Sequence, residues 1–219
     1  GVRIFVVIVE PVKYNPMSGV IRVFNDIDVQ VNFAHADLVT TANLRAKAYS
    51  PHFLNLFNHT LLNASSIQYR DEITRYPIKY VIISDPMFEA QLQPFIAWKI
   101  QQGFEIIESY TNDPAIGTTT TSIKAYLQGL WDDATLEDPA PSYVLFVGDV
   151  GQIPAWSGST GSHITDLNYV KLDGNNIVPD MYYGRFSANN TSELQPQIDK
   201  TLMYEKYEMP DPSYLEEVV

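Results

Sequence analysis

The sequence predicts an α/β fold with a mostly parallel sheet and flanking helices, preceded by a segment rich in β-strands. From Lys79 onward, short apolar runs alternate with stretches of helical periodicity. This alternation is typical of parallel strands joined by right-handed helical crossovers. Residues 2–33 differ, because they carry β-branched residues on both sides of a turn. With 45% hydrophobic and 12% aromatic residues among 219, the chain has enough apolar surface for a sizeable core.

Residues 2–33 are expected to form two strands. Residues 2–10 are rich in β-branched side chains, residues 15–19 have turn chemistry, and apolar and polar positions alternate from 21 to 33. Two strands cannot bury a core alone in water, so we expect them to belong to a larger β domain. Another strand should begin at Leu215. We therefore expect the chain to be a fragment of a longer protein.

Residues 34–77 are expected to form a linker. They are largely polar and contain prolines, and only residues 53–62 suggest a short helix. Exposed Arg70 and Arg75 in such a segment would suit a trypsin-like processing protease. An ordinary surface loop is the alternative, and composition alone slightly favours it.

A strand at residues 80–83 should open the α/β part. Asp85 and Pro86 fit the N-cap and the first position of a helix. Gly103 is expected to end that helix and Pro94 to kink it. Its core face is expected to repeat every four residues, at Phe88, Leu92, Ile96 and Ile100.

Further strands are expected at residues 104–108 and 143–147, and the second is the most convincing buried strand in the chain. Between them, several capping residues at 118–122 precede a helix that runs to Leu130. This order of strand, helix and strand supports the parallel sheet.

A hairpin is expected next. Asp173 and Gly174 form a strong two-residue hairpin signal, with strands at residues 169–172 and 177–183. The last helix should begin at a capping box of Ser192 with Gln195. Its expected core residues are Leu194, Ile198 and Leu202.

Composition and charge exclude several functions. The chain has 26 acidic and 14 basic residues, and the net charge of −12 would repel a phosphate backbone, so no nucleic acid is expected as a partner. No apolar run reaches the roughly 18 to 20 residues that a membrane helix needs, so no membrane span is expected. Cysteine is absent, so these residues contain no disulfide, thiolate metal site or cysteine nucleophile.

No catalytic motif stands out from the residues alone. There is no Gly-x-Ser-x-Gly sequence, and residues 84–88 lack the glycines of a nucleotide-binding loop. Asp85 and Asp149 follow predicted strands, where α/β sheets bind ligands, but helix capping is the favoured interpretation. A structural role is favoured for all four histidines, with an unrecognised triad as the alternative: His35, His52, His59 and His163.

The oxygen-rich stretch from Asp166 to Asp180 is the best local candidate for a site. Calcium takes roughly six to eight oxygen ligands, and this stretch supplies several. A solvated hairpin is the favoured alternative, because Asp, Gly and Asn are also turn residues.

Residues 143–154, Tyr-Val-Leu-Phe-Val-Gly-Asp-Val-Gly-Gln-Ile-Pro, resemble the gingipain-like cysteine endopeptidases of peptidase family C25. In that family a hydrophobic strand also runs into Val-Gly-Asp and then Ile-Pro. The resemblance covers roughly residues 80–205. Other landmarks agree in order and spacing: Trp98, Lys99, Gly103, Asp166, Tyr169, Gly174, residues 183–187, Gln197, Ile198, Asp199, Thr201, Tyr204 and Glu205.

The resemblance implies a caspase-like catalytic domain of two α/β subdomains with flavodoxin-like sheets. Residues 78–219 would be the first subdomain, truncated, and residues 1–59 the C-terminal part of a β-rich propeptide. Residues 60–77 would be an activation linker cut between Arg75 and Tyr76. The family's Cys nucleophile and His base lie in later sequence, so no catalytic residue is carried over to this chain.

The resemblance also implies a structural calcium ion bound by Asp166, Asn176, Asp180 and the Val178 carbonyl. It implies a secreted or cell-surface bacterial zymogen. The parent would act on protein or peptide substrates and pair these residues with a second catalytic subdomain. The alternatives are a non-enzymatic binding or adhesion module and a nucleotide-dependent α/β enzyme.

Overall fold

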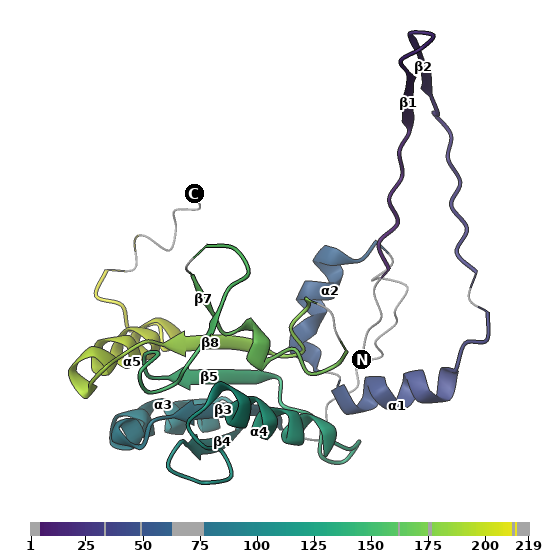
Figure 1. The fold of residues 1–219 in the computed structure, drawn as a ribbon. Coiled ribbons are helices and arrows are strands. Elements are labelled where there is room, and N and C mark those ends of the chain that lie inside the picture. Colours follow the sequence, from purple (N-terminus) through teal and green to yellow (C-terminus); the bar gives the residue numbers. More distant parts are fainter. Residues whose placement is uncertain are drawn as a thin grey trace.

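The fold is that of a computed structural model, in which residues 5–32, 34–48, 50–62, 77–161, 163–174, 177–211 and 213 are described. Figure 1 shows a layered α/β body, with an N-terminal hairpin that projects away from it. Before the body come β1 (Val12–Asn15), β2 (Val20–Val23), α1 (Leu38–Ala48), the 3-10 turn η1 (Pro51–Phe53) and α2 (Leu54–Thr60).

The body alternates strands and helices in the predicted order. Its first half contains β3 (Ile78–Ser84), the 3-10 turn η3 (Pro86–Phe88), α3 (Glu89–Gln101), β4 (Phe104–Tyr110) and α4 (Thr120–Asp132). Its second half contains β5 (Tyr143–Val147), β6 (Trp156–Ser157), β7 (Ile164–Thr165), the 3-10 turn η4 (Leu167–Tyr169), β8 (Tyr182–Phe186) and α5 (Thr191–Glu205).

The central sheet has four strands in the order β4-β3-β5-β8, and every pairing is parallel. The predicted mostly parallel sheet is therefore confirmed. The chain leaves β3 to one side for β4 and then crosses to the other side for β5. This reversal makes the carboxyl ends of β3 and β5 the switch point of the sheet, where open α/β folds bind ligands.

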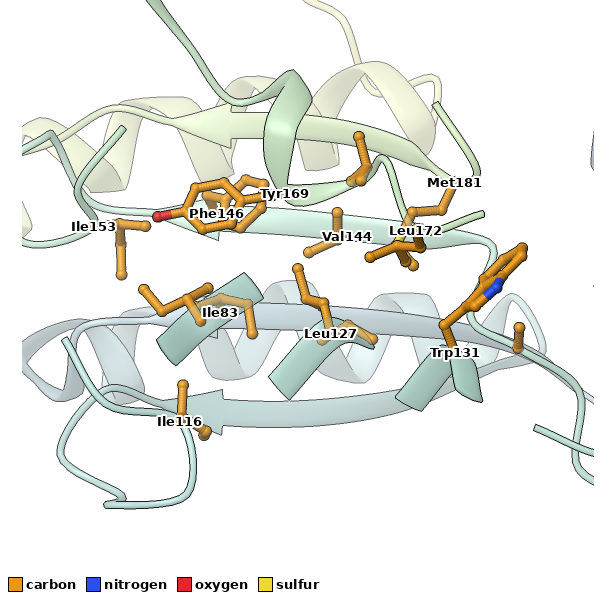
Figure 2. Close-up of a cluster of buried hydrophobic side chains, with 14 residues drawn as sticks. Ile83, Ile116, Leu127, Trp131, Val144, Phe146, Ile153, Tyr169, Leu172 and Met181 are labelled. Atoms are coloured by element: carbon orange, nitrogen blue, oxygen red, sulfur yellow. The ribbon is translucent and has the colours of Figure 1, made fainter. Parts of the chain in front are cut away.

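Helices cover both faces of the sheet. On one face, α3, η3 and α5 close a core that includes Phe88, Leu92 and Leu194. On the other face, α4 packs with the loop before β8. Figure 2 shows this second core, in which Leu127 and Trp131 of α4 face Val144 and Phe146 of β5.

Local capping chemistry sets the helix starts, partly as predicted. The Asp85 side chain accepts the Met87 N–H, as expected for an N-cap before Pro86. For α5 the predicted box of Ser192 with Gln195 is wrong: Asn190 is the N-cap and accepts the N–H of Glu193. Asn190 also donates to the Glu193 carboxylate at 2.9 Å, so this pair fixes the helix start two residues earlier.

The predicted core face of α3 is right at its first three positions and wrong at the fourth. Ile100 is 55% exposed, and Lys99 is buried instead. A four-residue step turns about 400° around a helix, so three steps rotate the face by about 120°. Ile100 has consequently turned away from the core.

The predicted hairpin around Asp173 and Gly174 is wrong in its strands. Gly174 adopts a left-handed turn conformation (φ 78°), but residues 170–172 and 177–181 form no strand, and β8 pairs in parallel with β5. The loop's carbonyl groups instead accept hydrogen bonds from side chains of α4. Lys124 donates to Asn168 O and Lys171 O, and Gln128 donates to Leu172 O.

The N-terminal hairpin forms, but its strands differ from those predicted. β1 begins after the strand expected at residues 2–10, and β2 covers only the start of the alternating stretch at residues 21–33. β1 and β2 pair from Val12↔Val23 to Asn15↔Val20. Residues 5–11 and 24–32 form no strand in the described structure. Backbone groups need a neighbouring strand to form a ladder, and alternation of side chains alone does not supply one.

The segment after the hairpin contains more helix than predicted. The helix expected around residues 53–62 is present as η1 and α2, while α1 was not predicted. Residues 63–76, which include Arg70, Arg75 and Tyr76, lie outside the described residues, and so does the strand expected from Leu215.

Candidate functional site

The switch point of the sheet is filled by side chains of the chain itself. Phe88 and Ile153 are fully buried there. Gly148, directly after β5, has a φ of 130°, and a Cβ added to it would lie 2.8 Å from the Gln152 side chain. Asp85 is occupied as a helix cap. This tight packing does not support the nucleotide-dependent alternative.

The same edge of the sheet carries a hub built around Arg185 of β8. Its Nε and Nη2 atoms donate to the two carboxylate oxygens of Asp166 at 2.8 and 2.7 Å. Its Nη1 donates to Gly148 O and Ile153 O at 2.8 and 2.9 Å. The guanidinium carbon lies 5.6 Å from the centre of the Phe146 ring. One mostly buried cation therefore joins two strands and the loop between them.

Tyr169 fastens the same loop from its other end. Its hydroxyl donates to Pro154 O at 2.5 Å. Its ring packs against Phe146 and Trp156, with centroids 4.6 and 4.5 Å apart. Burial raises the pKa of Tyr169, so the hydroxyl keeps its proton and remains a donor. Arg185 and Tyr169 together fold the loop onto the carboxyl edge of β5.

Asp149 stands on the exposed rim of this edge. Its carboxylate accepts the Val150 N–H at 2.9 Å, the Ser187 hydroxyl at 3.0 Å and the Asn189 amide at 3.4 Å. The bonds from Val150 and Ser187 lower the pKa of Asp149 below its ordinary value. The residue therefore ties the ends of β5 and β8 together, which is a structural task.

An open depression lies just after the carboxyl end of β3, next to the start of α3. It is lined by Pro86, Met87, Glu89, Ala90, Gln93 and Glu108. The Glu108 carboxylate accepts the Tyr110 hydroxyl at 2.6 Å and the Gln93 amide at 3.2 Å. The Glu108 carboxylate is therefore hydrogen-bonded to neighbouring side chains of the chain itself, and neither bond joins a nucleophile to a base.

The residues predicted to bind calcium are only partly brought together as ligands. Both oxygens of Asp166 bond Arg185, so this carboxylate does not fit a calcium ligand while that ion pair is closed. Asp180 Oδ2 accepts the N–H groups of Leu172 and Asp173 at 2.6 and 2.8 Å. Val178 is exposed, and Asn176 lies outside the described residues.

In the described part of the chain, no group of three or more His, Cys, Asp or Glu side chains is placed to hold a metal ion. Calcium binding by the predicted set stays a prediction.

The four histidines lie on separate segments of the chain, and all four are exposed. His52 contacts Tyr143 at the start of β5, with 2.5 Å between Nδ1 and the hydroxyl oxygen. His163 lies against Gly158, where an added Cβ would meet its ring. His35 follows the hairpin, and His59 is in α2. Among the described residues, no hydrogen bond joins one of these histidines to a serine hydroxyl or to a carboxylate.

A second buried ion pair joins α3 to α5. Lys99 Nζ lies 2.6 and 2.8 Å from the two carboxylate oxygens of Glu205, and Trp98 Nε1 donates to the same carboxylate at 2.8 Å. The ammonium group also lies 5.3 to 5.9 Å from the ring centres of Phe95, Phe104 and Tyr80.

The Arg185 hub and this second ion pair, which we call the Lys99 hub, account for five of the landmarks of the resemblance. Trp98 and Lys99 meet Glu205, and Asp166 meets Arg185. Reasoning from composition and periodicity missed both, because their members are 19 to 107 residues apart in sequence. The only sequence signal for these two ion pairs was the set of landmark residues that carries the family resemblance. No helix among the described residues is long and apolar enough to span a bilayer.

Comparison with known proteins identifies the family. The model of Peptidase family C25 matches residues 73–219. Lys-gingipain W83 of Porphyromonas gingivalis is 36% identical over all 219 residues, which span 12% of its length. Gingipain R2 of the same organism (strain ATCC BAA-308 / W83) is 26% identical over 196 residues, which cover 90% of this chain and 26% of that protein.

Solved structures agree with these sequence matches. A chain described as "Structure of Protease" is 38% identical with a TM-score of 0.56, covering 63% of this chain and 30% of that one. The crystal structure of the Arg-specific cysteine proteinase gingipain R is 28% identical with a TM-score of 0.52, covering 58% of this chain and 28% of the other. The caspase-like α/β fold and the sequence motifs lead to one conclusion: the chain belongs to peptidase family C25.

Proposed function

We propose that this chain is a non-catalytic N-terminal part of a gingipain-like cysteine endopeptidase precursor. The observation that carries the proposal is family membership in 219 residues that contain no cysteine. A cysteine peptidase needs a thiolate to attack the peptide carbonyl and a histidine as general base and acid. In this proposal both groups belong to sequence beyond Val219, and residues 78–219 provide the structural first subdomain.

The same proposal assigns residues 1–59 to the end of a propeptide and residues 60–77 to an activation linker, cut between Arg75 and Tyr76. Two findings support the division. The family model begins at residue 73, whereas Lys-gingipain W83 matches the whole chain. A solved complex of the pro- and mature domains of Porphyromonas gingivalis RgpB, 28% identical with a TM-score of 0.51, covers 57% of this chain and 29% of that one.

The parent would be a secreted or cell-surface bacterial protease that acts on proteins or peptides and contains a second catalytic subdomain. Membership of a protease family supports protein substrates. A structural calcium ion near Asp180, Val178 and Asn176 remains part of the proposal. Calcium binding there requires either that the Asp166–Arg185 pair opens or that Asp166 is not a ligand.

A peptidase assay tests the proposal. The purified 219-residue chain should release no dye from peptides ending in Lys or Arg, with or without a reducing agent. The matched sample is a longer version of the chain extended to include the next cysteine of the parent gene, which should gain activity that a thiol-alkylating reagent abolishes. Turnover by the short chain that survives alkylation would contradict the proposal, and a parent sequence without cysteine or histidine would favour a binding module.

Processing and calcium have separate tests. Limited digestion with trypsin should produce a fragment that begins at Tyr76, identified by mass spectrometry, and a chain that stays uncut there would remove the assigned linker. A structural calcium ion should raise the melting temperature, because a ligand of the folded state stabilises it. The Asp180→Asn variant should lose that rise, and equal rises in both chains would remove Asp180 from the ligand set.

A further inference from the structure

The start of α3 and the end of β4 border the open depression described above. Its volume of about 490 Å³ lies within the range of roughly 300 to 1,000 Å³ for small-ligand sites. Two carboxylates line it, Glu89 of α3 and Glu108 of β4. Its apolar part consists of Pro86, Met87 and Ala90. An acidic part and an apolar part therefore lie together on one small surface.

Neighbouring side chains hold the Glu108 carboxylate in place. Its Oε2 atom accepts the Tyr110 hydroxyl at 2.6 Å and the Gln93 amide at 3.2 Å. Burial raises the pKa of Tyr110, and the hydrogen bond to Glu108 and the charges of Glu108 and Glu89 raise it further. The hydroxyl therefore remains a donor. Among the described residues nothing bonds to the other oxygen, Oε1, so it is available to a ligand.

No lysine or arginine from the described part of the chain neutralises these carboxylates. None of the ion pairs found there includes Glu89 or Glu108. Glu89 is exposed, in the first turn of α3. Two negative charges at one depression repel each other and attract a cation from outside. The net charge of −12 adds to that attraction.

The strand that carries Glu108 is also an edge of the sheet. β4 pairs with β3 on one side, and no described strand pairs with its other side. Figure 1 shows β4 at the border of the sheet. An unpaired edge presents backbone N–H and C=O groups to an extended peptide, which can bind by adding a strand. Backbone groups for pairing and a side chain for selection therefore lie on the same strand.

A lysine or arginine side chain matches both parts of the depression. The hydrocarbon stem of such a side chain can lie on apolar surface while its charged head stays in a polar environment. Met87 is 45% exposed, so apolar surface is available to the stem. Hydrogen bonds between a charged donor and a carboxylate are stronger than those between neutral groups. The carboxylates therefore favour a basic side chain over an apolar one of the same length.

We propose that the outer edge of β4 and this depression form a binding site for an extended peptide segment that carries a lysine or an arginine. The backbone of the segment pairs with β4, and Glu89 and Glu108 hold the basic side chain. The site consists of residues 86–110 alone. It does not depend on the proposed peptidase function, so either proposal can fail without the other.

Peptide titration followed by nuclear magnetic resonance tests this on the full chain. The probe is a short peptide of alternating threonine and valine with one central lysine. A second probe has norleucine there, which keeps the stem and removes the charge. The lysine probe should shift the amide signals of residues 86–90 and 104–110. The norleucine probe should bind at least about threefold more weakly, as for the loss of exposed ion pairs, and added salt should reduce the difference.

Glu89→Gln is the main variant, because Glu89 is exposed and the change preserves the size of the side chain. It should weaken binding of the lysine probe about threefold and leave the norleucine probe unchanged. The matched control is Glu105→Gln, which makes the same charge change at an exposed position of β4. Because successive side chains of a strand point to opposite faces, Glu105 lies on the face opposite Glu108. The control should bind both probes like the unaltered chain.

A lysine probe with N-methylated backbone amides should lose binding, because it cannot pair with an edge strand. Unchanged binding of this probe would overturn the proposal. Equal weakening by Glu89→Gln and Glu105→Gln would also overturn it, because attraction by net charge alone would then explain the binding. So would a lysine probe that leaves the β4 signals unshifted, because the carboxylates would then only protect the edge from pairing.

Discussion

The α/β body and the N-terminal hairpin use the same kind of residues to opposite effect. Val81 and Ile83 of β3 are 0% exposed, whereas Val6 and Ile8 of the arm before β1 are both 83% exposed. β3 has a parallel neighbour on each side and helices on both faces. The arm has a similar sequence but forms no strand in the described structure.

The difference shows that β-branched sequence predicts a strand only where a neighbouring strand completes the ladder. Strand propensity reflects packing on a pleated surface more than a preference of the backbone. Identical substitutions in the body and in the hairpin region therefore separate the contribution of packing from that of the residue type.

The largest difference is expected at arginine. Arg185→Met leaves the largely buried Asp166 carboxylate and the carbonyl groups of Gly148 and Ile153 without their donor. We expect a loss of about 4 kcal/mol in the free energy of unfolding, as for breaking a buried ion pair. Urea denaturation measures it. The control Arg22→Met, in exposed β2, should change stability by less than about 0.5 kcal/mol.

A core isoleucine should give the next largest effect. Ile83→Ala removes a fully buried side chain between β5 and α4 and should cost about 3 kcal/mol. Ile8→Ala, in the exposed arm, should cost less than about 0.5 kcal/mol. Similar losses from both variants would mean that the arm is packed in solution.

A single hydroxyl should give a smaller difference. Tyr169→Phe removes the hydrogen bond to Pro154 O but keeps the ring between Phe146 and Trp156. The expected loss is about 1 kcal/mol. Tyr14→Phe in β1 is the control, and thermal unfolding of the two variants should show a lower melting temperature for Tyr169→Phe alone.

The smallest effect is expected at Asp149 and depends on pH. Hydrogen bonds from Val150 and Ser187 lower the pKa of Asp149 below its ordinary value of 3.8, and the charge of Arg185 adds to this. Since the folded-state pKa is the lower one, the contribution to stability is present above pH 3.8 and is lost as the pH falls through the folded-state pKa.

Asp149→Asn should therefore be slightly less stable than the unaltered chain at pH 7 and equal to it at the acid end. Denaturation midpoints across this range measure the difference. The control is Asp28→Asn in the arm after β2, and a pH-independent difference at Asp149 would contradict the assigned hydrogen bonds.

Much of the body could be predicted because its signals are local. The apolar run of β5 and the Asp85 cap each lie within a few residues, and both are where the sequence places them. The failures arise where one signal serves two structures. Asp173 and Gly174 suit a hairpin turn and a loop equally, and in the structure Lys124 and Gln128 of α4 donate to carbonyl groups of the loop.

The hubs could not be predicted from periodicity because they form only after the chain has crossed the sheet. Arg185 and Asp166 are 19 residues apart in sequence, and Lys99 and Glu205 are 106 residues apart. The contacts of His52 and Phe53 with the amino-terminal end of the sheet were missed for the same reason. Their partners come from three different strands, and a polar segment read alone suggests a linker.

Hydrogen exchange tests most directly whether residues 47–57 and 77–211 form one cooperative unit from which the arms are excluded. Amides of β3, β5 and α5 should exchange only through global unfolding. The Ala140 amide, which donates to Lys47 O, should show the same protection. Residues 5–11 and 24–32 should exchange almost freely. Rapid exchange at Ala140, or arm protection equal to that of β5, would contradict this account.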